Sequence, residues 1–240
     1  MAQRQMKTLT DAFVVFMQHP SPILLIALII LFATLRISTA VYPQSIELWG
    51  ALVIILYWPF QEWWMHKILL HLPPLKWRGN EYEMNFARVH RLHHLEPKNL
   101  TLTFLPLSAI LVSLFVFSSL FYYCTHQWMY TCTWMCTASC STLLYEWTHY
   151  LTHTDYKPRG RYYRRIWKLH RLHHYKNEQY WFSFTIPWID QWLGTGPLAK
   201  EVPHSPTARL LRPSSSPSRN TESSNLDSSA TNTTSADTTS

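Results

Sequence analysis

Apolar residues gather in long blocks along this chain. Four blocks carry no charged residue: 23–35, 48–60, 104–123 and 127–145. The block at 104–123 is twenty residues long, enough to cross a bilayer as a helix. The block at 127–145 follows after a gap of three residues and contains small residues that suit close helix packing in lipid. These two blocks therefore predict a transmembrane hairpin.

The two shorter blocks are ambiguous by length. At thirteen residues each, 23–35 and 48–60 fit a span, a re-entrant segment or a buried helix. Residues 12–17 could extend the first block to spanning length, and residues 61–65 could extend the second. We therefore expect four spans. The first block starts late and has no small-residue cleavage site, so we expect no cleavable signal.

Positive charge is distributed unevenly around these blocks. Six Lys and Arg residues lie between 67 and 98, and eight lie between 157 and 176. The loops expected on the opposite side, around Pro43 and His126, have almost none, with Arg36 at one edge. By the positive-inside rule, the two basic stretches face the cytoplasm. Much of the net charge of +7 is then juxtamembrane, which disfavours a nucleic-acid partner.

The pattern predicts an all-α integral membrane protein with about four transmembrane helices and a helical cap on the cytoplasmic face. We divide the chain into an N-terminal cytoplasmic segment (1–20), a membrane domain (21–200) and a disordered Ser/Thr-rich tail (201–240). Between 213 and 240, 16 of 28 residues are Ser or Thr. The stretch has too few apolar side chains to offset the entropy cost of ordering, so we expect disorder there. A multi-pass protein of this kind would lie in the endoplasmic reticulum of a eukaryote or the inner membrane of a bacterium.

Histidines supply the candidate chemistry. Ten of the thirteen fall into four clusters, and the string HRLHH occurs twice. Each half of the chain runs from an apolar helix through Glu-Trp, a spaced histidine pair and a basic stretch to HRLHH, which is a weak internal duplication. Because the hairpin at 104–145 returns the chain to the side it left, all four clusters lie on one membrane face. The clusters are His66 and His71; His90, His93 and His94; His149 and His153; and His170, His173 and His174.

Helical spacing predicts how these imidazoles point. Residues i, i+3 and i+4 share one face of a helix, so each HRLHH should present its three imidazoles together, paired with one of the doublets. His149 and His153 also share a face. His66 and His71 are five apart and would diverge on a regular α-helix. A π-bulge or a helix end could reconcile them; otherwise one of that pair serves a different metal.

The donor set indicates a metal centre. Neutral imidazole binds iron, copper, nickel and zinc, and ten imidazoles suit two ions with five ligands each. The clusters lack cysteine, which disfavours a structural zinc finger. Acidic residues near the clusters could fix the ligands' tautomers from a second shell; the candidates are Glu62, Glu146, Asp155 and Glu178. We interpret the remaining histidines (His19, His126, His204) and the stripe Cys132, Cys136 and Cys140 as packing or interfacial residues.

The combined motif resembles a known family. The order HxxxxH, HxxHH, HxxxH, HxxHH, with a hydrophobic hairpin between the second and third boxes, is similar to the fatty acid hydroxylase / sterol desaturase superfamily of histidine-box membrane oxygenases. The resemblance covers about residues 45–196 and includes the stretch 177–195 after the last box. Within the superfamily the layout is most similar to fatty acid 2-hydroxylases.

The resemblance implies a di-iron enzyme that uses O2 and two external electrons to hydroxylate a C–H bond of a lipid, with a fatty acyl chain as the expected substrate. Zinc can replace iron in a purified form. Some fatty acid hydroxylases carry a fused N-terminal cytochrome b5, which is not expected here, so electrons would come from a separate cytochrome b5 or ferredoxin with its reductase. The basic residues at 159–168 could dock that carrier or anionic head groups. Substrate-channel candidates are Asn177, Tyr180, Trp181 and Phe182, with a bulky Trp-Phe pair where the family usually has a small residue.

Two alternatives stay open at this point. The first is a sterol or carotenoid desaturase or oxidase of the same superfamily. The second is a membrane metal- or haem-binding protein for electron transfer or transport. A transporter should carry ionisable residues within its spans, and the strongest spans have none. A bis-histidine haem protein should place lone histidines on facing helices, whereas these occur in triplets.

Overall fold

The structure is a computed structural model, and it describes residues 8–209. Within that range the chain is mostly helical, as the sequence predicted, with one small sheet that it did not predict. The proposed tail at 213–240 lies outside the described residues. The helices are α1 (Leu9–Phe16), α2 (Pro20–Ile37), α3 (Ser45–Trp64), α4 (Asn85–Leu95), α5 (Leu107–Thr125), α6 (Trp128–His153), α7 (Arg161–Tyr175) and α8 (Ile189–Trp192), with a π-helix η1 (Met65–Leu70), 3-10 turns η2 (Leu100–Thr103) and η3 (Ala199–Glu201), and strands β1 (Leu75–Trp77) and β2 (Asn80–Tyr82).

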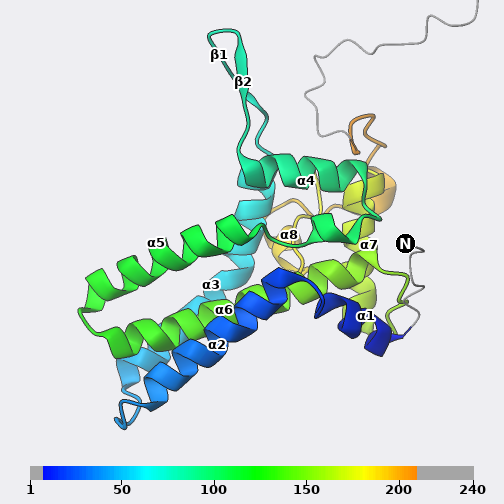
Figure 1. Cartoon of the computed structure of the whole chain (residues 1–240). Coiled ribbons are helices and arrows are strands. Elements are labelled where there is room, and N and C mark those ends of the chain that lie inside the picture. Colours follow the sequence, from blue (N-terminus) through cyan, green and yellow to red (C-terminus); the bar gives the residue numbers. More distant parts are fainter. Residues whose placement is uncertain (1–7, 210–240) are drawn as a thin grey trace, which may run out of the picture.

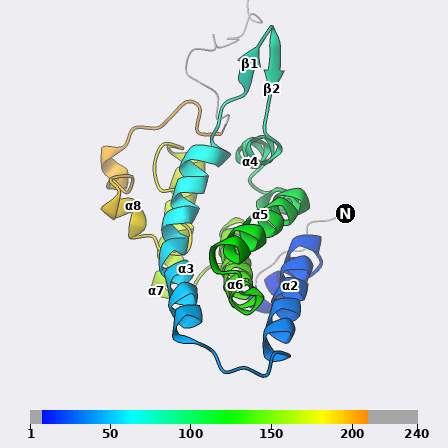
Figure 2. The same ribbon diagram turned by 90° about the vertical axis from the view of Figure 1, so that its left-hand side faces the viewer.

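Four long helices, α2, α3, α5 and α6, form a bundle in which α6 packs against the other three (Figure 1). The loop between α2 and α3 and the turn between α5 and α6 lie at one end of this bundle, and α4 lies at the other (Figure 2). The two HRLHH strings, on α4 and α7, are thereby brought to the end of the bundle where α3 and α6 finish.

Within residues 8–209, two helical segments are both long and apolar enough to cross a membrane, namely Pro20–Ile37 and Leu100–Thr125. Only 22% and 17% of the residues in the apolar windows of these two segments are buried inside the protein. Most of their apolar surface therefore faces outward, as expected for contact with lipid rather than for a soluble core. With α3 and α6 at 20 and 26 residues, the expectation of four spans stays a prediction.

The segment at 12–17 does not extend the first span, which corrects that part of the sequence analysis. The chain breaks after α1, and α2 begins at Pro20 with His19 as its N-cap, accepting from the Ser21 amide. Proline at the first helical position starts a new helix at low cost because its missing N–H has no partner there in any case. Phe16 of α1 instead packs in a separate apolar cluster against Tyr150 of α6.

The end of the bundle away from the histidines is closed by a polar clamp. Arg36 of α2 makes two contacts to Glu47 of α3, Nε–Oε1 at 2.5 Å and NH2–Oε2 at 3.0 Å. Thr133 of α6 donates to the same carboxylate, and the Trp134 indole donates to the Glu47 carbonyl at 3.0 Å. A Cβ added at Gly50 would come within 2.3 Å of that indole, so glycine is what lets α3 approach α6 here.

Along the cysteine stripe of α6, Cys132 is buried, Cys136 is partly buried and Cys140 is exposed. The Cys136 thiol lies 3.8 Å from the Ile29 carbonyl of α2. All four cysteines are free, and within residues 8–209 none belongs to a group that could hold a metal. This arrangement agrees with the packing interpretation.

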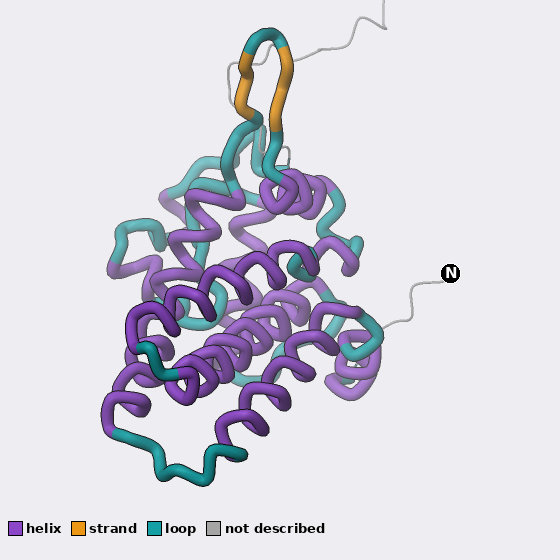
Figure 3. The backbone as a smooth tube through the Cα atoms, turned by 60° about the vertical axis from the view of Figure 1, so that its left-hand side comes forward, coloured by secondary structure: helices purple, strands orange, loops and turns teal. Residues whose placement is uncertain are grey.

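Strands β1 and β2 form a hairpin that projects from the bundle beside α4 (Figure 3). Arg78 and Gly79 join them, and both have positive φ (49° and 81°), as a two-residue turn of type I′ requires. Every residue of both strands is exposed. The hairpin was not predicted because its strands are three residues long and bury no apolar face.

Candidate metal centre

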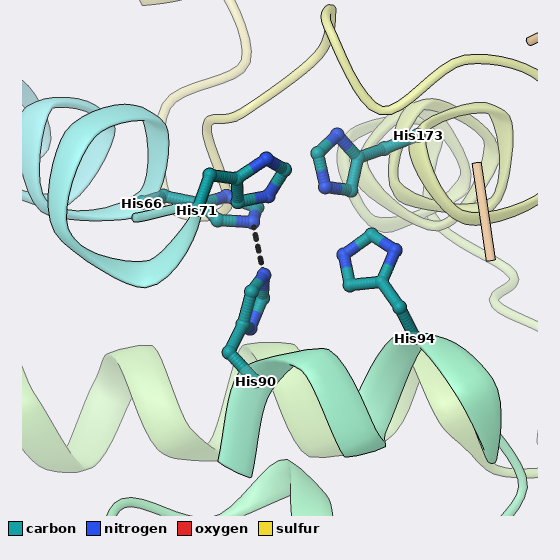
Figure 4. Close-up of side chains that lie close together, drawn as sticks. All are labelled: His66, His71, His90, His94 and His173. Carbon is teal, nitrogen blue, oxygen red and sulfur yellow. Dashed lines mark hydrogen bonds between the residues drawn. The ribbon is translucent and has the colours of Figure 1, made fainter. Parts of the chain in front are cut away.

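The ten clustered histidines form two groups of five, the division that the sequence predicted for two ions. In each group the candidate ligand nitrogens all lie within 4.8 Å of one another. Figure 4 shows the rings of the first group turned toward a common centre from three separate segments. The first histidine group is His66, His71, His90, His94 and His173, and the second is His93, His149, His153, His170 and His174.

Each HRLHH string is shared between the groups. On α4, His90 and His94 belong to the first group while His93 belongs to the second. On α7 the roles are reversed: the i and i+4 residues serve the second group, and His173 at i+3 serves the first. The expectation that one string supplies three ligands to one ion is therefore wrong. At 100° per residue, residues i+3 and i+4 point to opposite sides of residue i. Residue i+3 can therefore face one centre while i and i+4 face the other.

The pair His66 and His71 is reconciled by the π-helix η1, one of the two solutions that the spacing allowed. Helix α3 continues through Trp64 and then widens into η1 at Met65. In a π-helix the backbone bonds run from i to i+5, so residues five apart come to the same face. The two rings lie 5.1 Å apart, both in the first group.

The two groups are in direct contact. The His94 ring of the first group stacks on the His174 ring of the second, with centroids 4.1 Å apart and an interplanar angle of 21°. His93 and His94, neighbours in sequence, point to different groups with ring centroids 6.2 Å apart. Ions held by the two groups would be adjacent, as in a dinuclear centre.

Backbone carbonyls fix the tautomer of half of these histidines. An Nδ1–H that donates to a carbonyl leaves the lone pair on Nε2, the nitrogen that then faces a metal. Five rings are held in this way, at 2.6–2.9 Å. The pairs are His66 with the Phe182 carbonyl, His94 with Ala208, His149 with Thr103, His153 with Pro97 and His173 with Tyr180.

The remaining ring nitrogens fit metal ligation. The Nε2 atoms of His71, His94, His173 and His174 are buried and have no hydrogen-bonding partner among residues 8–209. Other Nε2 atoms approach one another, at 3.1 Å for His66 and His90 and 3.2 Å for His93 and His149. Two nitrogens at right angles on an ion at about 2.1 Å would be about 3.0 Å apart, and two opposite ones about 4.2 Å. Both spacings lie within the 4.8 Å limit of each group.

Burial keeps these imidazoles neutral, the form that binds metal. Eight of the ten are buried, and the other two are partly buried. Burial, reinforced by neighbouring imidazoles, holds the pKa of the HRLHH histidines well below 6.5. For His94, burial lowers the pKa to about 3.

Within residues 8–209, no carboxylate accepts a hydrogen bond from a ligand imidazole, contrary to expectation. Glu62 and Glu146 accept from backbone amides instead. Glu62 accepts from the amides of Phe184 and Thr185 and from the Thr185 hydroxyl. Glu146 accepts from the Leu105 amide at 2.8 Å and from a serine of α2. These segments adjoin Phe182 and Thr103, whose carbonyls accept from imidazoles. The carboxylates therefore support the ligands through the backbone and not, as predicted, by direct hydrogen bonds.

Asp190 was missed by the sequence analysis and does the same work. It is fully buried, and burial raises the pKa of its carboxyl group. It accepts from the Phe182 amide at 2.9 Å, the Ser183 amide at 2.8 Å and the Thr195 hydroxyl at 2.7 Å. A single aspartate beyond the last histidine box carries no spacing signal that would have identified it.

The two other acidic candidates differ from each other. Glu178 is buried and accepts from the hydroxyls of Ser205 and Thr207. Asp155 is exposed and lies at a pocket of about 70 Å³ that reaches His153, His170 and His174 of the second group.

Trp181 lies in the left-handed region at φ 60°, an unusual conformation for a bulky residue. The carbonyls on either side of it, from Tyr180 and Phe182, accept from His173 and His66 of the first group. The turn at Trp181 therefore directs the carbonyls of both its neighbours toward two ligands. Its indole donates to the Pro197 carbonyl at 3.1 Å.

Among the channel candidates, only Phe182 places its side chain against the histidines. Its ring centroid lies 5.3–5.5 Å from those of His66, His71 and His173. Phe184, which the sequence analysis did not single out, lies within 5 Å of rings from both groups and is fully buried. Asn177 instead donates to the Pro203 carbonyl.

Comparison with known proteins places the chain by its sequence. A family model described as fatty acid hydroxylase matches residues 51–195, which include all ten clustered histidines. No curated protein and no solved structure shows significant similarity to the chain.

Proposed function

The chain belongs to the fatty acid hydroxylase family, and from that premise we propose that it is a membrane-bound non-haem di-iron oxygenase. Its reaction would use O2 and two electrons to hydroxylate a C–H bond of a lipid, with a fatty acyl chain as the proposed substrate. The observation that carries this proposal is the pair of adjacent five-histidine groups, in which several buried Nε2 atoms have no hydrogen-bonding partner among residues 8–209.

The donor set favours iron over structural zinc. Zinc in structural sites is tetrahedral and often bound by cysteine, whereas each group here offers five imidazoles and no thiolate. The five imidazoles of each group would hold one ion. Iron bound in both groups would supply the activation of O2 and the oxidation of an unactivated C–H bond.

The protein's own part is to orient ligands and exclude water. Backbone carbonyls hold the Nδ1–H of five imidazoles, so these Nε2 lone pairs are presented without reorganisation. Phe182 and Phe184 form an apolar wall against the histidines. Such a wall keeps bulk water and stray reductants from a reactive centre.

A four-span topology agrees with the exposed surfaces of the bundle. Along α3, large apolar side chains such as Leu48, Val53 and Leu56 are more than half exposed, and Phe115 of α5 is 73% exposed. Lipid would cover this surface. The basic stretches flank the histidine end, so the positive-inside rule assigns that end to the cytoplasmic face, in the endoplasmic reticulum or a bacterial inner membrane.

This placement separates the proposed partners of the enzyme. A lipid would reach the centre from the bilayer, along the bundle, while a soluble cytochrome b5 or ferredoxin would approach from water. Arg161, Arg164 and Lys168 are exposed on α7 and supply positive charge for an acidic carrier. The pocket at Asp155 lies on the second histidine group and would admit small polar molecules there.

The geometry argues against the haem alternative. A bis-histidine haem needs the plane between its two axial ligands for the macrocycle. Here five nitrogens lie within 4.8 Å of one another in each group, so further imidazoles fill that plane.

The test is the lipid profile of a host that expresses the protein under 18O2. We expect a hydroxylated lipid carrying 18O in cells with the wild type and none with His173→Ala. His204→Ala, at an exposed position outside both groups, is the control and should match the wild type. A product that carries no 18O, or that persists in His173→Ala cells, would refute the proposal.

A further inference from the structure

A short segment after the last histidine box bonds to the C-terminal ends of both HRLHH helices. We call residues 202–209 the strap; it follows η3 and runs toward the end of α4 (Figure 1, orange). Val202 and Ala208 are buried at 5% and 4% exposure. The sequence analysis assigned this segment to a disordered tail, whereas the structure packs it against the histidine domain. It also lies beyond the residues that the family model matches.

One bond joins the strap to the metal centre. The Ala208 carbonyl accepts from His94 Nδ1 at 2.9 Å, while His94 Nε2 faces the first group without a partner among residues 8–209. A carbonyl in this position fixes the tautomer and the orientation of a ligand and raises its basicity. His66 and His173 of the same group take their carbonyls from the turn at 180–182 instead. The strap therefore reaches one ligand of one group.

The strap is anchored at the ends of α7 and α4. The Ser205 amide donates to the Lys176 carbonyl at 2.7 Å, just after α7. The Thr207 hydroxyl donates to Glu178 at 2.7 Å, and the Ser205 hydroxyl donates to the same oxygen at 3.1 Å. Arg209 donates to the Leu95 carbonyl at the end of α4. This use of Glu178 explains a buried carboxylate that contacts no imidazole.

We propose that the strap is a positioning element for the first metal site, setting His94 through the Ala208 carbonyl. The proposal rests on metal binding as proposed above. Removing the outer partner of a metal-ligating histidine typically weakens metal binding by about 10–100-fold. Loosening the strap should produce a loss of that size at one site and leave the other unchanged.

The experiment titrates cobalt(II) into the metal-free full-length protein and follows the two binding steps by visible absorption. The test variant is Ser205→Ala/Thr207→Val, which removes both hydroxyls that hold the strap to Glu178. Thr207→Val alone is a milder, nearly isosteric variant that carries the test if the double variant does not fold. His204→Ala is the matched control, since this side chain is exposed in the strap and makes no hydrogen bond within residues 8–209.

We expect the double variant to weaken one cobalt step about 10–100-fold, Thr207→Val to weaken the same step less, and His204→Ala to match the wild type. Added to His94→Ala, the strap substitutions should cause no further loss, because the ligand through which they act is already gone. Wild-type affinity at both steps, equal weakening of both, or additive loss with His94→Ala would overturn the proposal. Wild-type protein that binds no cobalt would instead overturn the proposed function on which it rests.

Discussion

Acidification should destabilise the metal-free protein sharply below about pH 6.5, the ordinary pKa of histidine. The six HRLHH histidines are buried, and burial holds the pKa of each well below 6.5 in the folded chain. Below that pH the unfolded chain takes up protons that the folded chain does not. The free energy of unfolding therefore has its full value above about pH 7 and decreases as the pH falls below 6.5.

The size of the loss follows from the number of buried rings. At about pH 5.5, one unit below the unfolded pKa, each imidazole that stays neutral in the fold costs about 1.4 kcal/mol. Six such rings reach at most ~8 kcal/mol, comparable with the whole stability of a typical domain. Buried carboxyl groups act in the opposite direction and reduce this loss; burial raises the pKa of Asp190, for example.

The assay is thermal unfolding of metal-free protein in one detergent, recorded between about pH 8 and pH 5.5. We expect a flat melting temperature above pH 7 and a steep fall below pH 6.5. His204→Ala, which removes an exposed imidazole, should leave the curve unchanged. A melting temperature that is constant down to pH 5.5 would refute the reasoning that these rings are buried and neutral.

Three further predictions follow from the geometry. His90→Ala/His93→Ala changes one string but both groups, so elemental analysis should show less of both metal ions. His93→Ala/His170→Ala changes both strings but only the second group, so one ion should remain. The reverse pattern would contradict the division of each string between the groups. Asp190→Ala strands three buried donors and should cost about 3 kcal/mol in a denaturation experiment, so an unchanged midpoint would count against its bracing role. Gly50→Ala should cost about 1–3 kcal/mol by clashing with the facing indole, while Leu56→Ala on the exposed face of α3 should change little; equal effects would show that the close approach is not needed.

The sequence predicted the donor set because the spacing of the histidines and the position of the apolar hairpin can both be read directly from it. Clusters on both sides of an apolar hairpin must return to one end of it, and ten imidazoles divide naturally between two ions. The widened turn at His66 and His71 was also foreseeable, since five-residue spacing fits a π-helix. The division of each HRLHH between the groups was not, because it depends on where α4 and α7 cross relative to α3 and α6.

The supporting shell was less predictable for a physical reason. Carboxylates were expected beside the ligands, but the ligands' Nδ1–H groups donate to backbone carbonyls, which every residue carries and no motif marks. Ala208 illustrates this, since its side chain says nothing about the bond that its carbonyl makes to His94. The carboxylates of Glu62 and Asp190 matter through the backbone that they hold, a role visible only once the chain is folded.

The most direct test of a dinuclear iron centre is an anomalous difference map at the iron edge from crystals of the iron-loaded protein. A dinuclear centre predicts two peaks, one within the first histidine group and one within the second. A single peak, or peaks that lie away from these ten histidines, would contradict it.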